Sequence, residues 1–194
     1  MARPREFDRD GVLDRAMETF WARGYEATSI QNLVECMRIN RGSLYDTFRD
    51  KRGVFLAAMD RYERIVAGDL LETLTAPGSG KEAIRRFFAS KVANAGRAGR
   101  PPGCLITNSA VERSLHDPHV AARVGASLAK MEAAFHGALM RARDGGEIGK
   151  RRDLRALARF LTNTAQGLSV LSRAGAARAA KEDIVSVALS FLDG

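Results

Sequence analysis

The chain has 194 residues, 45% of them hydrophobic and 28% charged, with a formal net charge of +8. This length suffices for one domain or two small ones, and no apolar run approaches the ~20 residues of a membrane-spanning helix, which argues against a membrane protein. The first residues lack the apolar core of a signal peptide, and the two cysteines, Cys36 and Cys104, indicate no disulfide framework, so we expect a cytoplasmic protein.

The net positive charge does not by itself locate a nucleic-acid site. Residues 1–52 hold 10 basic and 9 acidic side chains, so the rest of the chain carries +7 of the excess, and 25 of the 31 basic residues are Arg, as GC-rich codon usage would also produce. The segment 38–52 is more informative, because it has five basic residues against two acidic ones. This local excess marks a place where an anionic partner would be attracted.

The first predicted helix begins after Asp8, because the apolar residues that follow recur at the intervals of one helical stripe. The stripe consists of Val12, Leu13, Ala16, Met17, Phe20 and Trp21. Gly24 comes after it and is expected to end the helix in the left-handed conformation. The segment is therefore expected to pack through one face.

Two shorter helices are predicted next. Thr28 or Ser29 caps a helix of about eight residues, and Asn40 then begins another in which Leu44 and Phe48 face inward. A short helix, a tight turn and a second short helix with polar groups facing outward is the layout of a helix-turn-helix. Its second helix enters the major groove of DNA.

A fourth helix is predicted from Lys51, with Asp50 as its N-cap, and its apolar stripe continues to Leu74. At 1.5 Å per residue it is over ~30 Å long, so we expect it to be a strut. After a break at residues 77–80, no segment alternates as a strand does, and helices are predicted at about 80–95, 104–115, 118–143, 152–173 and 180–192. The sequence thus predicts an all-α fold of about nine helices.

We expect two domains, a helix-turn-helix DNA-binding domain over residues 1–50 and a helical bundle over residues 51–194. The last two predicted helices carry apolar residues separated by small ones, and such a pair can form a four-helix bundle with a second copy of the chain. The candidate residues for this dimer interface are Leu161, Leu168, Val185 and Phe191.

Polar residues of the predicted recognition helix are candidates for DNA contacts. Arg41, Ser43 and Asp46 can reach donors and acceptors on base edges, and Gly42 removes a side chain where the helix approaches the DNA backbone. Contacts with phosphates are expected from the helix start at Thr28 and from two further side chains, those of Tyr45 and Lys51. A solvated polar face of an ordinary three-helix bundle is the alternative interpretation of the same pattern.

Five residues of the bundle are candidates for a small-molecule site, because aromatic and polar groups fall on helical stretches that otherwise face a core. They are Phe88, Cys104, Asn108, Phe135 and Gln166. Plain core packing or surface exposure is the alternative for each of them. Cys104 is also a candidate sensor of oxidants or electrophiles, if Arg97, Arg100 or a helix N-terminus stabilises its thiolate.

No enzyme active site, metal site or cofactor is predicted. The chain has no glycine-rich phosphate loop, no Gly-x-Ser-x-Gly and no acidic pair at a meaningful spacing. His116 and His119 are three residues apart, but Pro118 lies between them and no further ligand is near in sequence. A loop in which Asp117 caps the next helix accounts better for this segment.

Two stretches of the sequence, FWARGYEATSI at residues 20–30 and NRGSLYDTFRDK at residues 40–51, resemble the tetracycline-repressor (TetR) family. Residues 102–109 resemble the start of the sixth helix in a branch of that family. The resemblance implies an all-α homodimer, a short palindromic operator and a divergent C-terminal body that binds a small effector. By position, it also implies phosphate contacts for Thr28, Tyr45 and Lys51, whereas Asp46 and Thr47 depart from the aromatic or His residues common in the motif.

The sequence therefore predicts a DNA-binding transcriptional regulator, expected to be a repressor that a small molecule releases from its operator. A ligand among the helices of the body would push the strut and change the separation of the two recognition helices. Two alternatives stay open. One is a DNA-binding architectural protein without effector control, and the other is a helical interaction module that has lost DNA binding.

Overall fold

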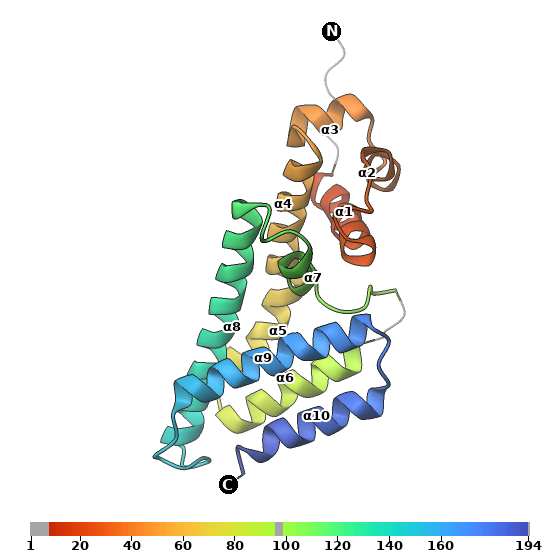
Figure 1. Ribbon diagram of the computed structural model, residues 1–194. Coiled ribbons are helices and arrows are strands. Elements are labelled where there is room, and N and C mark those ends of the chain that lie inside the picture. The colour runs from red at the N-terminus through yellow and green to blue at the C-terminus, as the bar shows by residue number, and fades with distance from the viewer. Residues whose placement is uncertain (1–7, 96–98, 194) are drawn as a thin grey trace.

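The computed structural model describes residues 8–95 and 99–193, and this part of the chain consists of helices joined by loops, with no strand (Figure 1). The predicted all-α fold is therefore confirmed. The helices are α1 (Arg9–Arg23), α2 (Ile30–Met37), α3 (Arg41–Phe48), α4 (Lys51–Tyr62), α5 (Gly68–Thr75), α6 (Gly80–Asn94), α7 (Leu105–Glu112), α8 (Pro118–Asp144), α9 (Leu154–Arg173) and α10 (Arg178–Ser190), with a π-helical segment η1 (Glu63–Ala67) between α4 and α5.

Side-chain caps define the starts of the first four helices. Asp8 caps α1, Ser29 caps α2 in a reciprocal capping box with Asn32, and Asn40 and Asp50 cap α3 and α4. Each side-chain oxygen accepts a backbone N–H that the helix itself leaves unpaired. The caps fix where each helix begins and hence the sharp turns of the helix-turn-helix.

Gly24 has a positive φ of 89° but an extended ψ of 173°, so the expected left-handed cap of α1 is wrong in detail. A Cβ at this position would lie about 3 Å from the carboxylate of Glu112, on α7. The glycine thus allows both the unusual backbone angle and the close approach of a distant helix.

The helix predicted from residue 51 to residue 74 is a continuous rod, here called the strut, but it is not α-helical throughout. Residues 63–67 form a π-helical turn between α4 and α5. The strut spans 25 residues, or ~37 Å at 1.5 Å per residue. In Figure 1 it descends from α3 at one end of the molecule to the helices of the body at the other, with α8 beside it.

Two hydrophobic cores lie along the strut. The first joins α1, α2, α3 and α4 to α7 and to the start of α8, and the second lies among α5, α6, α8, α9 and the last residues of the described chain. The first core crosses the expected domain boundary between residues 50 and 51, since Val54 and Phe55 of α4 are buried in it. None of the described helices is long and apolar enough to cross a membrane.

Candidate nucleic-acid interface

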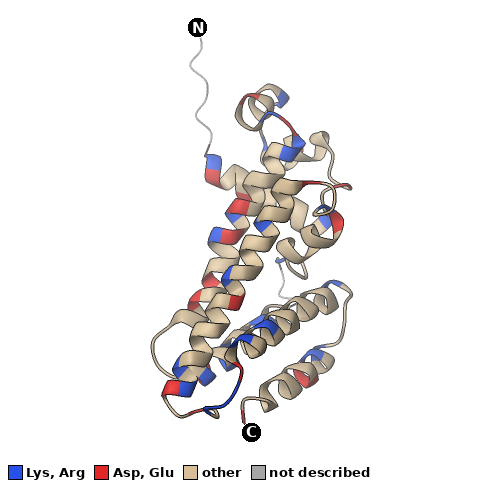
Figure 2. Cartoon of the chain, turned by 60° about the vertical axis from the view of Figure 1, so that its left-hand side comes forward, with Lys and Arg blue, Asp and Glu red and all other residues tan. Residues whose placement is uncertain are grey.

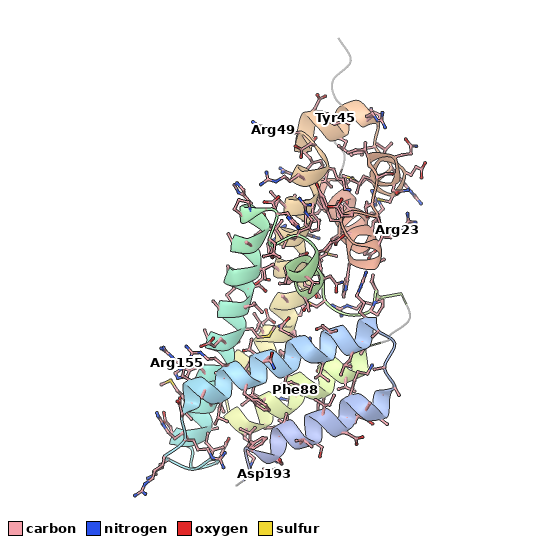
Figure 3. All side chains as sticks on the ribbon, in the orientation of Figure 1. Arg23, Tyr45, Arg49, Phe88, Arg155 and Asp193 are labelled. Carbon is pink, nitrogen blue, oxygen red and sulfur yellow. The ribbon has the colours of Figure 1, made fainter. Side chains whose placement is uncertain are left out.

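Helix α3 forms the outer end of the molecule, where Figure 3 shows Tyr45 and Arg49 far from Phe88 and Asp193 of the body. Leu44 is fully buried and Phe48 is only 6% exposed, so these two side chains anchor the helix from inside. The opposite face is open to solvent. It carries five exposed residues, Arg41, Gly42, Tyr45, Asp46 and Thr47, and the half-buried Ser43.

The turn that orients α3 is tight and has an unusual backbone conformation. Arg38 ends α2 in the left-handed conformation, with φ 57° and ψ 41°, and its side chain is exposed. Asn40 Oδ1 accepts the backbone N–H of Ser43 at 2.7 Å. The two helices are thus held at a fixed angle, with the N-terminus of α3 at the surface, as a helix that enters a groove requires.

The junction between α3 and α4 is equally tight. Arg49 has φ 70° and ψ −49°, and the N–H of Asp50 donates to the carbonyl of Phe48 at 2.9 Å, which is the pattern of a γ-turn. A Cβ on Gly53 would lie 1.9 Å from the same Phe48 carbonyl oxygen. Only glycine at position 53 permits this approach of α4 to the end of α3.

Thr28 does not lie where a phosphate contact requires. Its side chain is fully buried and its hydroxyl donates to the carbonyl of Gly24 at 2.7 Å, so it fastens the loop between α1 and α2. The cap of α2 is the exposed Ser29. The sequence did not distinguish Thr28 from Ser29 as the N-cap of α2. The structure assigns the cap to Ser29, because Thr28 is buried and its hydroxyl is bonded elsewhere.

Lys51 lies at the N-terminus of α4 beside the loop between α1 and α2. Its Nζ is 4.2 Å from the centroid of the Tyr25 ring and 3.5 Å from the carbonyl oxygen of Glu26. Burial raises the pKa of Tyr25, so its ring stays neutral and its face can attract the cation. These contacts hold the ammonium group near the base of the recognition helix.

The outer end of the molecule carries both signs of charge (Figure 2). Arg38, Arg41 and Arg49 are exposed there, and so is Asp46, for which no ion pair to a described residue is found. Arg38 and Arg49 are additional candidates for phosphate contacts, because they flank the recognition helix at both ends. The local charge excess in segment 38–52 was their signal in the sequence.

A set of polar contacts joins the helix-turn-helix to the body. Arg52 of α4 makes a two-pronged ion pair with Asp117, through Nε at 2.5 Å and Nη2 at 2.9 Å, and Asp117 also caps α8. The hydrogen bonds from the Arg52 guanidinium hold the pKa of Asp117 well below its ordinary range. Asp117 is therefore the helix cap that the sequence predicted, and in addition a link between domains.

Two further contacts complete this junction. The carboxylate of Glu112 accepts the backbone N–H groups of Tyr25 and Glu26, both at 2.9 Å. The guanidinium of Arg173, at the end of α9, donates to the carbonyl oxygen of Trp21 at 3.0 Å. Helices α7 and α9 thus hold the loop between α1 and α2 and the end of α1, so side chains of the body contact the helix-turn-helix directly.

A cavity of about 330 Å³ lies directly behind this junction. Its described lining comes from α1, the strut, α6, the segment before α7, α7 itself, α8 and α9, and it includes Cys104 and Gln166 from the predicted set. Gln166 accepts a hydrogen bond from Thr107 at 2.5 Å. The sequence did not identify other polar lining groups, above all those of Trp21 and Lys91, because they come from separate elements.

Three of the five predicted ligand residues lie outside the lining of this cavity. Phe88 and Phe135 are fully buried and stack on each other in the second core, with ring centroids 5.7 Å apart. Asn108 is half-buried next to Gly103. Of the two arginines expected near Cys104, Arg100 lines the cavity, and Arg97 lies outside the described residues.

The predicted dimer residues divide between the core and the surface. Leu161 and Leu168 are buried in the core of their own protomer and Val185 is half-buried, whereas Phe191 is 51% exposed. Leu161 and Leu168 therefore lie on the wrong face of α9 for an interface between protomers. The exposed large apolar side chains of α9, α10 and the residue that caps α10 are here called the outer apolar face; they are Phe160, Val170, Ile184, Val187 and Phe191.

Comparison with known proteins identifies both halves of the chain. Residues 12–58 match the family model described as bacterial regulatory proteins of the tetR family, and residues 80–186 match that of the tetracyclin repressor-like C-terminal domain. The HTH-type transcriptional regulator YezE of Bacillus subtilis is 41% identical over all 194 residues and over its own full length. The HTH-type transcriptional repressor ComR of Escherichia coli is 35% identical over 90% of this chain and 83% of its own.

The fold comparison agrees with these sequence matches. The chain superposes with a TM-score of 0.88 on a cysteine variant of the TetR family transcriptional regulator CifR in complex with 26-base-pair operator DNA, at 31% identity and covering 97% of this chain and 98% of that one. An exposed short helix held at the outer end of an all-α molecule is thus found in a relative that binds duplex DNA. The chain belongs to the tetracycline-repressor (TetR) family of DNA-binding transcriptional regulators.

Proposed function

We propose that the protein is a homodimeric repressor that binds a palindromic operator through α3 and leaves it when a small molecule occupies the cavity behind the domain junction. The observation that carries the proposal is the position of Trp21, which belongs to α1 of the helix-turn-helix and also lines the cavity. A molecule in the cavity would contact the DNA-binding domain and the body at once. Repression is supported by the similarity to ComR, a repressor.

Within the interface, we assign base contacts to Arg41, Ser43 and Asp46, whose side chains are presented by the outer face of α3. Gly42 is exposed beside them and allows the helix to approach the DNA backbone. Phosphate contacts are assigned to Tyr45 and Lys51. Ser29 takes the place expected of Thr28 at the start of α2, since the Thr28 hydroxyl is buried.

Release follows from geometry. Successive major-groove half-sites of a palindrome lie about 34–36 Å apart, so a dimer binds both only while its recognition helices keep that separation. The cavity borders Val66 and Ala67 of the strut as well as Trp21 of α1. Displacement of either wall by a few Å would take the two recognition helices out of register.

The dimer is expected to form through the outer apolar face of α9 and α10. Phe160 and Phe191 already pack edge to face in one protomer, with ring centroids 5.6 Å apart, and Val170 and Val187 are more than half exposed. Two such helices from each protomer would form a four-helix bundle. This face replaces Leu161 and Leu168 in the predicted interface.

The direct test is a fluorescence-anisotropy titration of the purified protein against the DNA upstream of its own gene, at two salt concentrations and with random DNA as competitor. We expect saturable binding that survives the competitor, at two protomers per duplex. Weak binding that vanishes with added salt would indicate only electrostatic attraction and would favour the interaction-module alternative. Specific binding that no small molecule relieves would favour an architectural protein.

A further inference from the structure

The cavity behind the junction is lined by hydrogen-bond donors that lack acceptors. Lys91 of α6 lines it, and no hydrogen bond or ion pair joins its ammonium group to any described residue. Arg100 also lines it, with its guanidinium 5.2 Å from the centroid of the Trp21 ring. The indole Nε1–H of Trp21 is buried and has no acceptor among the described residues.

The described lining of the cavity offers no carboxylate that pairs with Lys91 or Arg100. The described lining contains one acidic residue, Asp69, which is exposed to solvent on α5 and is not among the groups that act on Lys91. Glu63, on the neighbouring turn of the strut, already accepts from Ser127 at 2.8 Å and from Lys130 at 3.3 Å. The interior of the cavity is therefore electropositive.

An isolated ammonium group in such a place costs free energy, because water is partly removed and nothing replaces it. Burial lowers the pKa of Lys91; Cys104 acts electrostatically in the opposite direction, and the charge of Arg100 lowers the pKa further. Since Lys91 borders the cavity, an anion placed there would supply the missing partner. A charge-assisted hydrogen bond of this kind is among the stronger ones that proteins make.

The rest of the lining limits the size and character of such a ligand. The volume of about 330 Å³ is at the small end of the range for ligand sites. Val66, Leu70, Ile106 and Met131 provide apolar wall. The cavity thus suits a short apolar body that ends in a negatively charged group.

We propose that the effector is a small organic carboxylate, whose anionic group pairs with Lys91 at the position that Arg100 and Trp21 also border. This inference rests on the proposed function, since it names the chemical class of the molecule that would occupy the cavity. Cys104 is an alternative partner of Lys91, because the two groups act on each other electrostatically. A thiolate at Cys104 would remove the need for a ligand anion.

The test is calorimetric titration of the full-length protein, without DNA, with straight-chain carboxylates of three to eight carbons, with benzoate, and with the primary amide of each. We expect at least one carboxylate to bind once per chain and its amide to bind at least tenfold more weakly. Lys91→Met keeps the aliphatic length and should lose at least tenfold in affinity. Arg86→Gln, exposed on the same helix, is the matched control and should bind as wild type.

A second measurement does not depend on the choice of ligand. Because Lys91→Met removes a partly desolvated charge, the ligand-free variant should melt at a higher temperature than the wild type. The proposal would be overturned if the amides bound as tightly as the acids, or if no carboxylate of the panel bound. It would also be overturned if Lys91→Met kept full affinity or melted at a lower temperature than the wild type. Operator binding of the wild-type protein is measured separately, without any carboxylate. Specific operator binding together with a failed carboxylate test would reject the ligand class but keep the proposed regulatory function.

Discussion

Tyr45 and Lys51 are expected to contact phosphates and Arg41 to contact base edges, so their replacement should have different consequences. Tyr45→Ala and Lys51→Ala should weaken binding to every duplex, and Lys51→Ala should lower the slope of log affinity against log salt by about 1. Arg41→Ala should cost about 1–3 kcal/mol on the preferred operator and relax the preference at one base pair.

The measurement is an anisotropy titration over a set of single-base operator variants at several salt concentrations. Arg155→Ala serves as a control of equal charge change, because Figure 3 shows Arg155 in the body, far from α3. If all three variants of the interface bound like the control, the assignment of the DNA contacts would be wrong.

Asp117 should make stability depend on pH in acid. Its pKa in the folded chain is held below the ordinary value of ~4, so its ion pair with Arg52 stabilises the fold fully above that pH. This stabilisation declines as the pH falls from about 4 towards the lower folded-state pKa. Asp117→Asn keeps an N-cap side chain but removes the charge. We expect the variant to melt at a lower temperature than the wild type at pH 7.

The comparison with Asp117→Asn is to be made by thermal unfolding from pH 7 down to pH 3. The difference between the two proteins should shrink below about pH 4, because the Asp117 carboxylate of the unfolded wild type then binds a proton that the folded chain does not. A difference that stays constant over this range would show that the cap rather than the ion pair is what Asp117 contributes.

At the scale of elements, the junction between α3 and α4 depends on one glycine. Gly53→Ala would place a Cβ against the carbonyl of Phe48, so either α3 or α4 must move, at a cost of about 1–3 kcal/mol in the free energy of unfolding. The matched control is Gly125→Ala, on an exposed face of α8 with no atom near its Cβ. There alanine should stabilise the helix by about 0.5–1 kcal/mol.

Urea unfolding followed by circular dichroism measures both changes. Because Gly53 positions the recognition helix, Gly53→Ala should also weaken operator binding at concentrations of urea where the chain is still folded. Equal stability of the two glycine variants would contradict the close approach that the backbone of residue 48 makes to α4.

The elements themselves could be predicted from the sequence, because caps and apolar stripes are local signals. Asp50 and Asn40 begin their helices as predicted, and the starts of α6 and α8 agree with the predicted ranges. The faces of α9 could not be predicted in the same way. Apolar residues lie on both of its sides, and the periodicity does not tell which side, that of Leu168 or that of Val170, packs within the protomer.

Contacts between helices that are distant in the chain could not be predicted from the sequence either. Arg52 and Asp117 are 65 residues apart, and Trp21 and Lys91 come from different helices, so nothing local relates them. Each of these side chains has an ordinary local explanation, as a helix start, a cap, a core residue or a surface charge. The cavity exists only because several elements meet.

At the scale of the whole molecule, the outer apolar face predicts the outcome of charged substitutions. Val187→Glu, at a position 63% exposed in the protomer, should yield a folded monomer, and it should weaken operator binding because the two half-sites are then no longer bound together. Leu168→Glu buries an unpaired charge and should abolish the fold. Light scattering gives the mass and circular dichroism the helix content.

The two variants test different claims. A dimer mass for Val187→Glu would place the interface elsewhere on the molecule. A folded Leu168→Glu chain that is monomeric would instead restore the interface expected from the sequence, with Leu168 between protomers.

The π turn at residues 63–67 sets the rotational phase between the two halves of the strut. An α-helix advances about 100° per residue. The core-facing residues of α4 end at Tyr62, and in an uninterrupted α-helix residue 69 would be one of the next positions to face the core. In the structure Asp69 is instead exposed, and Leu70 and Leu74 pack against the second core. The π turn therefore contains one residue more than an α-helical turn, and this extra residue shifts the core-facing positions of α5 from 69 and 73 to 70 and 74.

Chain length in the strut is consequently a requirement of its own. Deletion of one residue between 63 and 67 would remove the extra residue and leave a regular helix with Leu70 and Leu74 still facing the core, whereas insertion of one residue there, without a second wide turn, would rotate α5 by about 100°. Among relatives of this chain, insertions should therefore fall in the loop at residues 76–79 and spare the strut, and a relative without the π turn should be one residue shorter there.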